Sequence, residues 1–200
     1  MRSAPASSLP DAIRIETERT VVRLGRETDA PALLEHLVQN RAYHAPWEPR
    51  VREDFYTLDV QRRALALRLC EFAEGRSACL LVFDREHDVP VIGRVNFTQI
   101  VRGAFHGCVL GYAIDRNHEG RGYMTEALRG ALEWAFAELR LHRIAANYRP
   151  ENQRSERVLE KLGFVREGYA RSYLYVDGRW SDHVLTALTN PHPERVRVER

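Results

Sequence analysis

Two glycines separated by one residue, Gly120 and Gly122, lie between an apolar run, Leu110–Ile114, and a long helical pattern. Glycine allows a tight turn and places no side chain between its N–H group and a ligand. The first turn of the following helix adds unpaired N–H donors and the positive end of the helix dipole. Such a turn can bind phosphate oxygens, so the sequence predicts a nucleotide- or coenzyme-binding enzyme.

Two common phosphate-binding motifs do not fit this turn. A P-loop requires Gly-x-x-x-x-Gly-Lys-Ser/Thr, which the chain lacks, and a dinucleotide-binding fingerprint requires glycine where Thr125 occurs. The remaining pattern resembles motif A of the GNAT acetyltransferases, which hold the pyrophosphate of acetyl-CoA on this turn. Asn117 replaces the Gln or Arg of that motif, and Arg116 beside it is an alternative donor. The alternative is a purely structural role, in which the glycines only connect a strand to a helix.

A second segment strengthens the resemblance. Asn152 and Ser155 begin a predicted helix that closes on Gly163-Phe164, as in GNAT motif B. Asn152 can cap the helix, and Gly163 suits the left-handed residue after its end. The resemblance implies that Asn152 and this helix also hold the pantetheine arm.

The co-substrate implied by the resemblance is acetyl-CoA. The residues expected to bind it are Tyr112, Ala113, Ile114, Asn117, Glu119, Gly120, Arg121, Gly122, Tyr123, Met124, Thr125, Asn147, Asn152, Ser155 and Lys161. Arg121 and Lys161 are the side chains that could meet a phosphate, and either could equally be a solvated surface residue.

Acetyl transfer from a thioester to an amine requires removal of a proton from the amine, stabilisation of the oxyanion and protonation of the departing thiolate. The resemblance implies that backbone N–H groups at the end of the 108–114 run stabilise the oxyanion. The proton-donor candidates are Ser155, Tyr148 and Tyr112, and the base candidates are Glu48, Glu119 and His106. A loop histidine is more often an ordinary surface residue, and proton loss through a water chain would need no dedicated base.

Further runs carry a closer resemblance. They are Pro46–Pro49, Val101–His106, Leu110–Tyr112, His142–Tyr148, Glu167–Ala170 and Asp182–Thr189. They look like the RimJ branch of the family, the ribosomal-protein-alanine N-acetyltransferases. This resemblance implies that the acceptor is the N-terminal alanine of the fifth small-subunit ribosomal protein. Two alternatives stay open: acetylation of a small amine such as a polyamine, aminoglycoside or amino sugar, and a non-catalytic acetyl-CoA-binding regulatory module.

An N-terminal peptide needs an open groove, which the 41–56 loop and the 169–183 hairpin could wall. The aromatic candidates for this groove are Tyr43, Trp47, Tyr173, Tyr175 and Trp180. They could equally pack between the hairpin and the core. The acidic residues that could steer a basic acceptor are Glu48, Glu53, Asp54 and Asp182.

The elements that position these residues follow from periodicity and turn signals. Strands are predicted over 21–24, 78–84, 89–97, 108–114, 142–147, 169–176 and 180–189, with a hairpin turn at Asp177-Gly178. Helices are predicted from Thr28, over 58–74, after Gly122 and after Asn152. The fold class is α+β (α/β). The resemblance implies the GNAT acyl-CoA N-acyltransferase fold, with flanking helices on a mixed, mostly antiparallel sheet that splays between its fourth and fifth strands around the coenzyme.

Composition excludes several other classes. The chain has 200 residues, 44% of them hydrophobic, and a net charge of +2, so charge gives no case for direct nucleic-acid or membrane binding. Three cysteines and eight histidines show no metal-ligand spacing, so no metal is expected, and reduced thiols fit a cytoplasmic protein. We expect a flexible segment over 1–12, a GNAT domain over 13–190 and a loose tail over 191–200. The sequence leaves the oligomeric state open.

Overall fold

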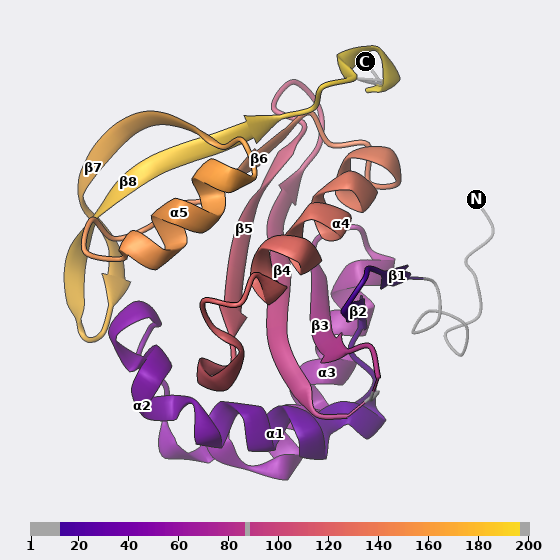
Figure 1. Cartoon of the computed structure of the whole chain (residues 1–200), viewed down its shortest axis with the longest axis vertical. Coiled ribbons are helices and arrows are strands. Elements are labelled where there is room, and N and C mark those ends of the chain that lie inside the picture. The colour runs from indigo at the N-terminus through magenta and orange to yellow at the C-terminus, as the bar shows by residue number, and fades with distance from the viewer. Residues whose placement is uncertain (1–12, 87–88, 197–200) are drawn as a thin grey trace.

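The computed structural model describes residues 13–86 and 89–196. Eight strands in this range form one sheet in the order β1-β2-β3-β4-β5-β6-β8-β7 (Figure 1). The strands are β1 (Arg14–Glu16), β2 (Thr20–Leu24), β3 (Ala78–Asp84), β4 (Val91–Val101), β5 (Gly107–Ile114), β6 (Arg143–Ala145), β7 (Val165–Val176) and β8 (Arg179–Thr189). All neighbouring pairs are antiparallel except β5–β6, which is parallel. The predicted mixed, mostly antiparallel sheet is therefore confirmed.

Helices cover both faces of this sheet. They are α1 (Ala30–Gln39), α2 (Arg41–His44), α3 (Leu58–Ala73), α4 (Tyr123–Ala137) and α5 (Gln153–Lys161). Alternate residues of β3 face opposite sides, as the period of a strand requires. Leu80 and Val82 join the hydrophobic cluster that contains the buried stripe of α4, whereas Leu81 and Phe83 join the cluster that contains residues of α1 and α3. The sheet is thus buried between two helical layers.

The sheet opens between β5 and β6. These strands pair through three residue pairs, of which Val109↔Ala145 is the last. Beyond it, the Leu110–Ile114 part of β5 pairs with β4 on one side, and on the other side it pairs with no strand of the described residues. Figure 1 shows β5 and the β7–β8 hairpin diverging from β6, with α5 over the space between them. The splay lies between the fourth and fifth predicted strands, as the resemblance implied.

Three local predictions need correction. The hydrophobic pattern missed β1, which has only three residues. The 41–56 segment is not an irregular loop, because it contains α2 and short 3₁₀ turns at Ala45–Trp47 and Glu53–Tyr56. Pro46 is accommodated in the first turn, where its missing N–H breaks no hydrogen bond. The strand predicted over 142–147 is shorter, because the chain after Ala145 no longer pairs with β5, while the N–H groups of Ala146 and Tyr148 donate to β8.

The predicted ends of the domain stay predictions, and residues 1–12 lie outside the described range. In the predicted C-terminal tail, Pro193–Arg195 form a 3₁₀ turn. Within residues 13–86 and 89–196, no helix is long and apolar enough to span a bilayer.

Candidate active site

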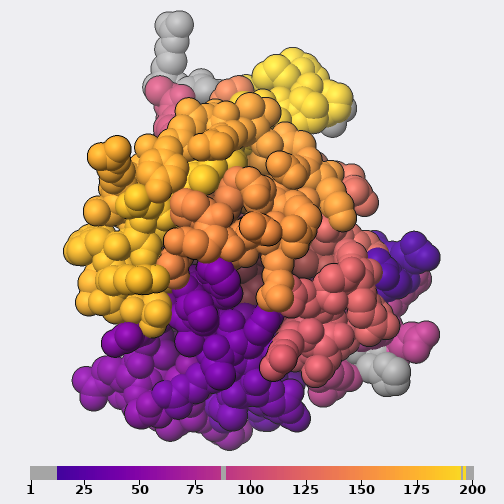
Figure 2. All heavy atoms as spheres, turned by 60° about the vertical axis from the view of Figure 1, so that its left-hand side comes forward, coloured from indigo at the N-terminus to yellow at the C-terminus, as the bar shows by residue number. Residues whose placement is uncertain are grey.

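A pocket of about 710 Å³ occupies the opening beside β5. Its walls are the free part of β5, the glycine turn, α5, the 43–48 segment, the residues after β6, and His183 of β8. In the space-filling view, the surfaces of the N-terminal helices, of α5 and of the α4 region meet around a hollow (Figure 2). Segments distant in the sequence therefore form one cavity.

The glycine turn has the backbone geometry that its sequence predicts. Gly120 and Gly122 both adopt left-handed conformations, with φ of +71° and +87°. Gly122 is the N-cap of α4, and no side chain among the described residues caps that helix. The first N–H groups of α4 therefore remain available to an anion, and the dipole of this 15-residue helix favours negative charge at the same place.

The buried carboxylate of Asp115 holds the segment that precedes the two glycines. Asp115 accepts hydrogen bonds from Asn40 Nδ2 at 2.8 Å, from the Asn117 N–H at 2.8 Å and from His118 Nδ1 at 3.1 Å. Burial alone would raise the pKa of Asp115, but these hydrogen bonds lower it below its usual range. The Arg116 N–H also donates to Asn40 Oδ1 at 2.9 Å. Asn40 at the end of α1 thereby fixes the segment that leads into the glycines.

A second carboxylate, that of Glu126, holds the turn on the side where α4 begins. Glu126 of α4 accepts from Thr17 Oγ1 at 2.6 Å and from Arg19 Nε at 2.7 Å. Burial raises the pKa of Glu126, but the hydrogen bonds from Thr17 and Arg19 outweigh that effect and lower it. Arg19 also donates to the Arg121 carbonyl at 3.0 Å. The glycine turn is therefore tied on both sides to the N-terminal part of the chain.

On α5, the Asn152 side chain caps the helix by accepting from the Ser155 N–H at 3.1 Å. The Ser155 Oγ lies 2.7 Å from the Tyr112 hydroxyl. Burial raises the pKa of Tyr112, so its hydroxyl stays protonated at neutral pH. A hydroxyl pair is therefore positioned between β5 and α5, inside the pocket.

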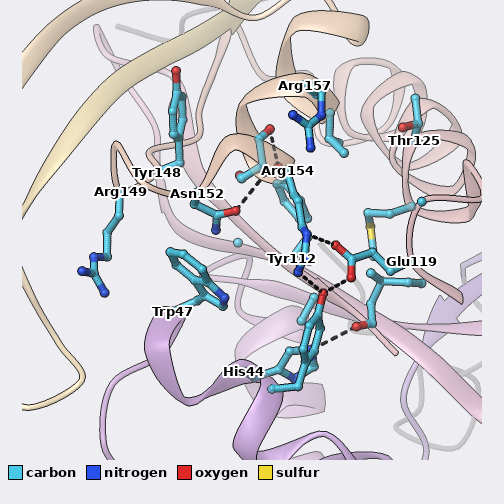
Figure 3. A pocket seen from close by; sticks show the side chains of 18 of the residues that line it. His44, Trp47, Tyr112, Glu119, Thr125, Tyr148, Arg149, Asn152, Arg154 and Arg157 are labelled. Atoms are coloured by element: carbon cyan, nitrogen blue, oxygen red, sulfur yellow. Dashed lines mark hydrogen bonds and ion pairs between the residues drawn. The ribbon is translucent and has the colours of Figure 1, made fainter. Parts of the chain in front are cut away.

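Tyr148 has a different environment. Its hydroxyl donates to Glu156 at 2.8 Å, and burial, with a further contribution from Glu156, raises its pKa to about 12. Figure 3 shows this ring directed away from Tyr112. Tyr148 lines the pocket, but its hydroxyl is hydrogen-bonded to Glu156 of α5.

An ionic network crosses the pocket from α2 to α5 (Figure 3). The Tyr43 hydroxyl donates to Glu119, whose other oxygen lies 2.6 Å from Arg154 Nε. Arg154 Nη1 also donates to the Tyr43 hydroxyl at 2.9 Å. Burial, and next the bond to Glu119, raise the pKa of Tyr43 to about 12. Glu119, predicted as a base or coenzyme ligand, has both carboxylate oxygens occupied.

The structure brings most predicted coenzyme residues together in this pocket. Those that line it are Tyr112, Ala113, Ile114, Glu119, Gly120, Gly122, Met124, Thr125, Asn147, Asn152, Ser155 and Lys161. Asn117, Arg121 and Tyr123 are not among its lining residues. The Asn117 N–H is used by Asp115, and the Arg121 guanidinium lies 5.5 Å from the centre of the Tyr123 ring.

His106 is also outside the pocket. It precedes β5, at the end opposite the glycine turn, and its carbonyl accepts from the N–H groups of His142 and Arg143. Its ring is buried, with Nε2 3.5 Å from Arg102 Nη1. The eight residues of β5 separate it from the turn, roughly 26 Å at the rise of a strand. The structure therefore places His106 outside the pocket, away from the other predicted site residues.

Several pocket residues were not predicted. Arg154 and Arg157 line the pocket together with Lys161, at a spacing of three and four residues that places them on one side of α5. This helical spacing was a readable signal. Arg116, which the sequence offered as an alternative donor beside Asn117, also lines the pocket. His44 and His183 also line the pocket, and only tertiary structure brings these distant histidines together.

The side of the pocket away from α4 carries both aromatic and charged side chains. Trp47 and Glu48 line it, and Glu48 Oε1 accepts from Arg94 Nη2 at 2.6 Å. Arg149 lies 5.6 Å from the centre of the Trp47 ring and donates to the Pro46 carbonyl at 2.6 Å. Of the other aromatic candidates, Tyr43 lines the pocket too, whereas Tyr173, Tyr175 and Trp180 are exposed and do not.

The acidic residues that were expected to steer a basic acceptor also separate into one that lines the pocket and three that do not. Glu48 lines the pocket, whereas Glu53, Asp54 and Asp182 do not. Glu53 pairs with Arg41, and Asp182 accepts from Tyr169 and from the Ser172 N–H. Among the described residues, no three His, Cys, Asp or Glu side chains gather as metal ligands. The expectation of no metal stays a prediction.

Comparison with known proteins gives a consistent result. A family model described as "Acetyltransferase (GNAT) domain" matches residues 19–165. The chain is 42% identical to the [Ribosomal protein uS5]-alanine N-acetyltransferase of Escherichia coli over 179 residues, which are 90% of this chain and 92% of that protein.

Solved structures agree. A ribosomal-protein-S5-alanine acetyltransferase from Vibrio fischeri superimposes with a TM-score of 0.85 at 35% identity, covering 90% of this chain and 97% of that one. Mycobacterium smegmatis RimJ in complex with CoA-disulfide gives a TM-score of 0.83 at 29% identity, covering 88% and 87%. The similarity therefore extends over nearly the whole described chain.

Proposed function

The chain belongs to the GNAT acetyltransferases, and from this premise we propose that it transfers the acetyl group of acetyl-CoA to the N-terminal alanine of ribosomal protein uS5. It is an N-acetyltransferase, as its curated relatives are. The acceptor assignment is supported by the likeness to the E. coli and V. fischeri enzymes, whose names specify that alanine. A ribosomal acceptor implies action in the cytoplasm.

The observation that carries this proposal is the continuity of the pocket. One end has bare glycine N–H groups at a helix N-terminus, with Arg116, Arg154, Arg157 and Lys161 near it. These groups match the phosphates of acetyl-CoA in charge and hydrogen bonding. The other end lies between Trp47, Glu48 and Arg149, where an N-terminal residue could approach the thioester.

The free edge of β5 supports the path between these ends. Among the described residues, Leu110–Ala113 has no strand partner on the open side, which suits the amides of a pantetheine arm. Acetyl-CoA, when bound, supplies the thioester to be attacked. Ser155 and Tyr112 place protonated hydroxyls beside this path, so we assign proton donation to the departing thiolate to Ser155, with Tyr112 positioning it.

The test is an acceptor panel. The protein is incubated with acetyl-CoA and with peptides beginning Ala, Ser or Met, the Ala peptide carrying the uS5 sequence, and with spermidine and an aminoglycoside. Mass spectrometry and thiol release measure the product. We expect the Ala peptide to give the highest kcat/KM. Acetylation of small amines without peptides would favour the alternative substrate class. Tight coenzyme binding without turnover on any amine would favour a regulatory module.

A further inference from the structure

His183 is a buried histidine whose tautomer the structure defines. The residue is 4% exposed, it lines the pocket, and its Nδ1 lies 2.9 Å from the Ser181 carbonyl oxygen. A carbonyl oxygen can only accept, so Nδ1 carries the proton in that bond. Nε2 then has a free lone pair when the ring is neutral, and it forms no hydrogen bond with another side chain or backbone group of residues 13–86 and 89–196. His183 therefore presents an unused proton acceptor at the cavity.

The other titratable groups at this side of the pocket already have hydrogen-bond or ion-pair partners. Glu48 pairs with Arg94, and the Tyr148 hydroxyl donates to Glu156. Arg149 is held by the Pro46 carbonyl. The groups adjoining His183 itself are Tyr173 of β7, whose ring centre is 5.7 Å away, and Asp182 on its own strand. Asp182 accepts from Tyr169 and from the Ser172 N–H.

Two other histidines line the pocket, but both lie near the coenzyme turn. His44 Nε2 lies 2.9 Å from the Ile114 carbonyl at the end of β5, and His118 Nδ1 lies 3.1 Å from Asp115. Both are thus attached to the segment that leads into the glycines. His183 is instead next to Val184, which bridges to Tyr148 beyond the last β5–β6 pair.

The faces of the strands separate His183 from the proton donors. Val184 packs in the hydrophobic cluster that includes Leu159 of α5, and alternate residues of a strand face opposite sides. His183 therefore faces away from α5, whereas Ser155 lies on α5 and bonds to Tyr112. A thioester lying in the opening would have the hydroxyl pair on one side and the His183 imidazole on the other. This arrangement suits a reaction that removes a proton at one atom and supplies one at another.

We propose that His183 Nε2 is the base that takes the proton of the acceptor amine, an inference that rests on the proposed function. The amine nitrogen forms the C–N bond to the acetyl carbon, and the C–S bond breaks with its electron pair left on the coenzyme sulfur. The proton lost by the nitrogen goes to His183 Nε2, and the Ser155 hydroxyl protonates the thiolate. Solvent returns the proton to Ser155 and removes that of His183.

The test compares the wild-type enzyme with His183→Gln and His183→Ala. For each, kcat/KM of the acceptor is measured from pH 5.5 to 9, and the coenzyme Kd is measured separately to show that the fold is kept. His183→Gln should lose about 10²-fold in kcat/KM, and its acidic limb should report one ionisation, that of the amine, instead of two. Added imidazole should restore turnover to His183→Ala, because it replaces the missing base.

The matched control is His142→Gln, which changes an exposed histidine that does not line the pocket. Its kcat/KM and pH profile should equal those of the wild-type enzyme. An unchanged two-ionisation profile in His183→Gln, or absence of imidazole rescue in a folded His183→Ala, would overturn the proposal. The assay uses whichever amine the wild-type enzyme acetylates. A small-amine acceptor would therefore refute the ribosomal assignment and still leave the role of His183 to be decided by these variants.

Discussion

The two halves of the pocket are built in different ways. The half proposed to bind the coenzyme comes from two short stretches, residues 110–125 and 152–161, and offers backbone N–H groups and one face of α5. The half proposed to bind the acceptor combines Trp47 and Glu48, the residues after β6 and His183 of β8. A ligand shared by a whole family can be bound by local backbone geometry. Recognition of one particular amine instead requires side chains from distant segments.

The two halves also differ in how firmly they are held. Asp115 and Glu126 each receive three hydrogen bonds at the glycine turn. Near the acceptor side, the β7–β8 hairpin carries exposed aromatics, with Tyr175 at 53% and Trp180 at 64% exposure packed edge to face. The glycine turn is therefore held by buried and part-buried polar contacts, whereas the tip of the hairpin carries exposed aromatic side chains.

The largest expected effect separates catalysis from coenzyme binding. Ser155→Ala should lower kcat by roughly 10²-fold and change the coenzyme Kd by only about 2-fold, because a general acid acts in the transition state. Tyr112→Phe removes the hydroxyl 2.7 Å from Ser155 and should reduce kcat less. Steady-state kinetics and calorimetry measure the two quantities. Equal losses of kcat and affinity in Ser155→Ala would make Ser155 a binding residue only.

The next effect tests the coenzyme half directly. Gly122→Asp places a carboxylate where phosphate is expected and should weaken coenzyme binding by roughly 30- to 150-fold, about 2–3 kcal/mol. Calorimetric titration with CoA measures this change. Gly75→Asp is the control, because Gly75 has a similar φ of +69°, with open space around its added Cβ, at the end of α3. If both variants bind CoA like the wild-type protein, the turn does not hold the phosphates.

The smallest effect on binding concerns the anchor of the turn. Asn40→Ala removes one donor to the Asp115 carboxylate and should lower the free energy of unfolding at pH 7 by about 1–3 kcal/mol. The coenzyme Kd should rise only about 2- to 5-fold, because the glycines keep their own conformations. Gln39→Ala is the control, since that exposed amide donates to Glu35 in its own helix.

The loss of stability in Asn40→Ala should also depend on pH. The pKa of Asp115 is lower in the folded protein, so its contribution to stability is present above the unfolded value of about 3.9 and is lost as pH falls through the folded pKa. Because Asn40 helps to lower that pKa, the deficit of Asn40→Ala should shrink between pH 7 and pH 3. Urea unfolding at several pH values measures it. A deficit that stays constant with pH would mean that Asn40 acts through packing alone.

Local sequence signals were sufficient to predict the elements of the proposed coenzyme half. The two glycines, the stripe of α4 and the Asn152 cap are local signals, because turns, helical periodicity and caps depend on neighbours within a few residues. The hairpin at Asp177-Gly178 was predicted for the same reason, and both residues have positive φ. Even the positive face of α5 was readable from the spacing of Arg154, Arg157 and Lys161.

Tertiary structure alone decided the acceptor half and the anchors of the turn. Asn40 meets Asp115 across 75 positions, and Tyr43 meets Glu119 across 76. No periodicity relates such pairs, because their proximity depends on how α1 and α2 pack beside β5. His106, a reasonable base by residue type, lies at the wrong end of its strand, and His183 lies in the pocket. The divergence of β5 from β6 sets which residues meet in the cavity, and that divergence is a property of the whole sheet.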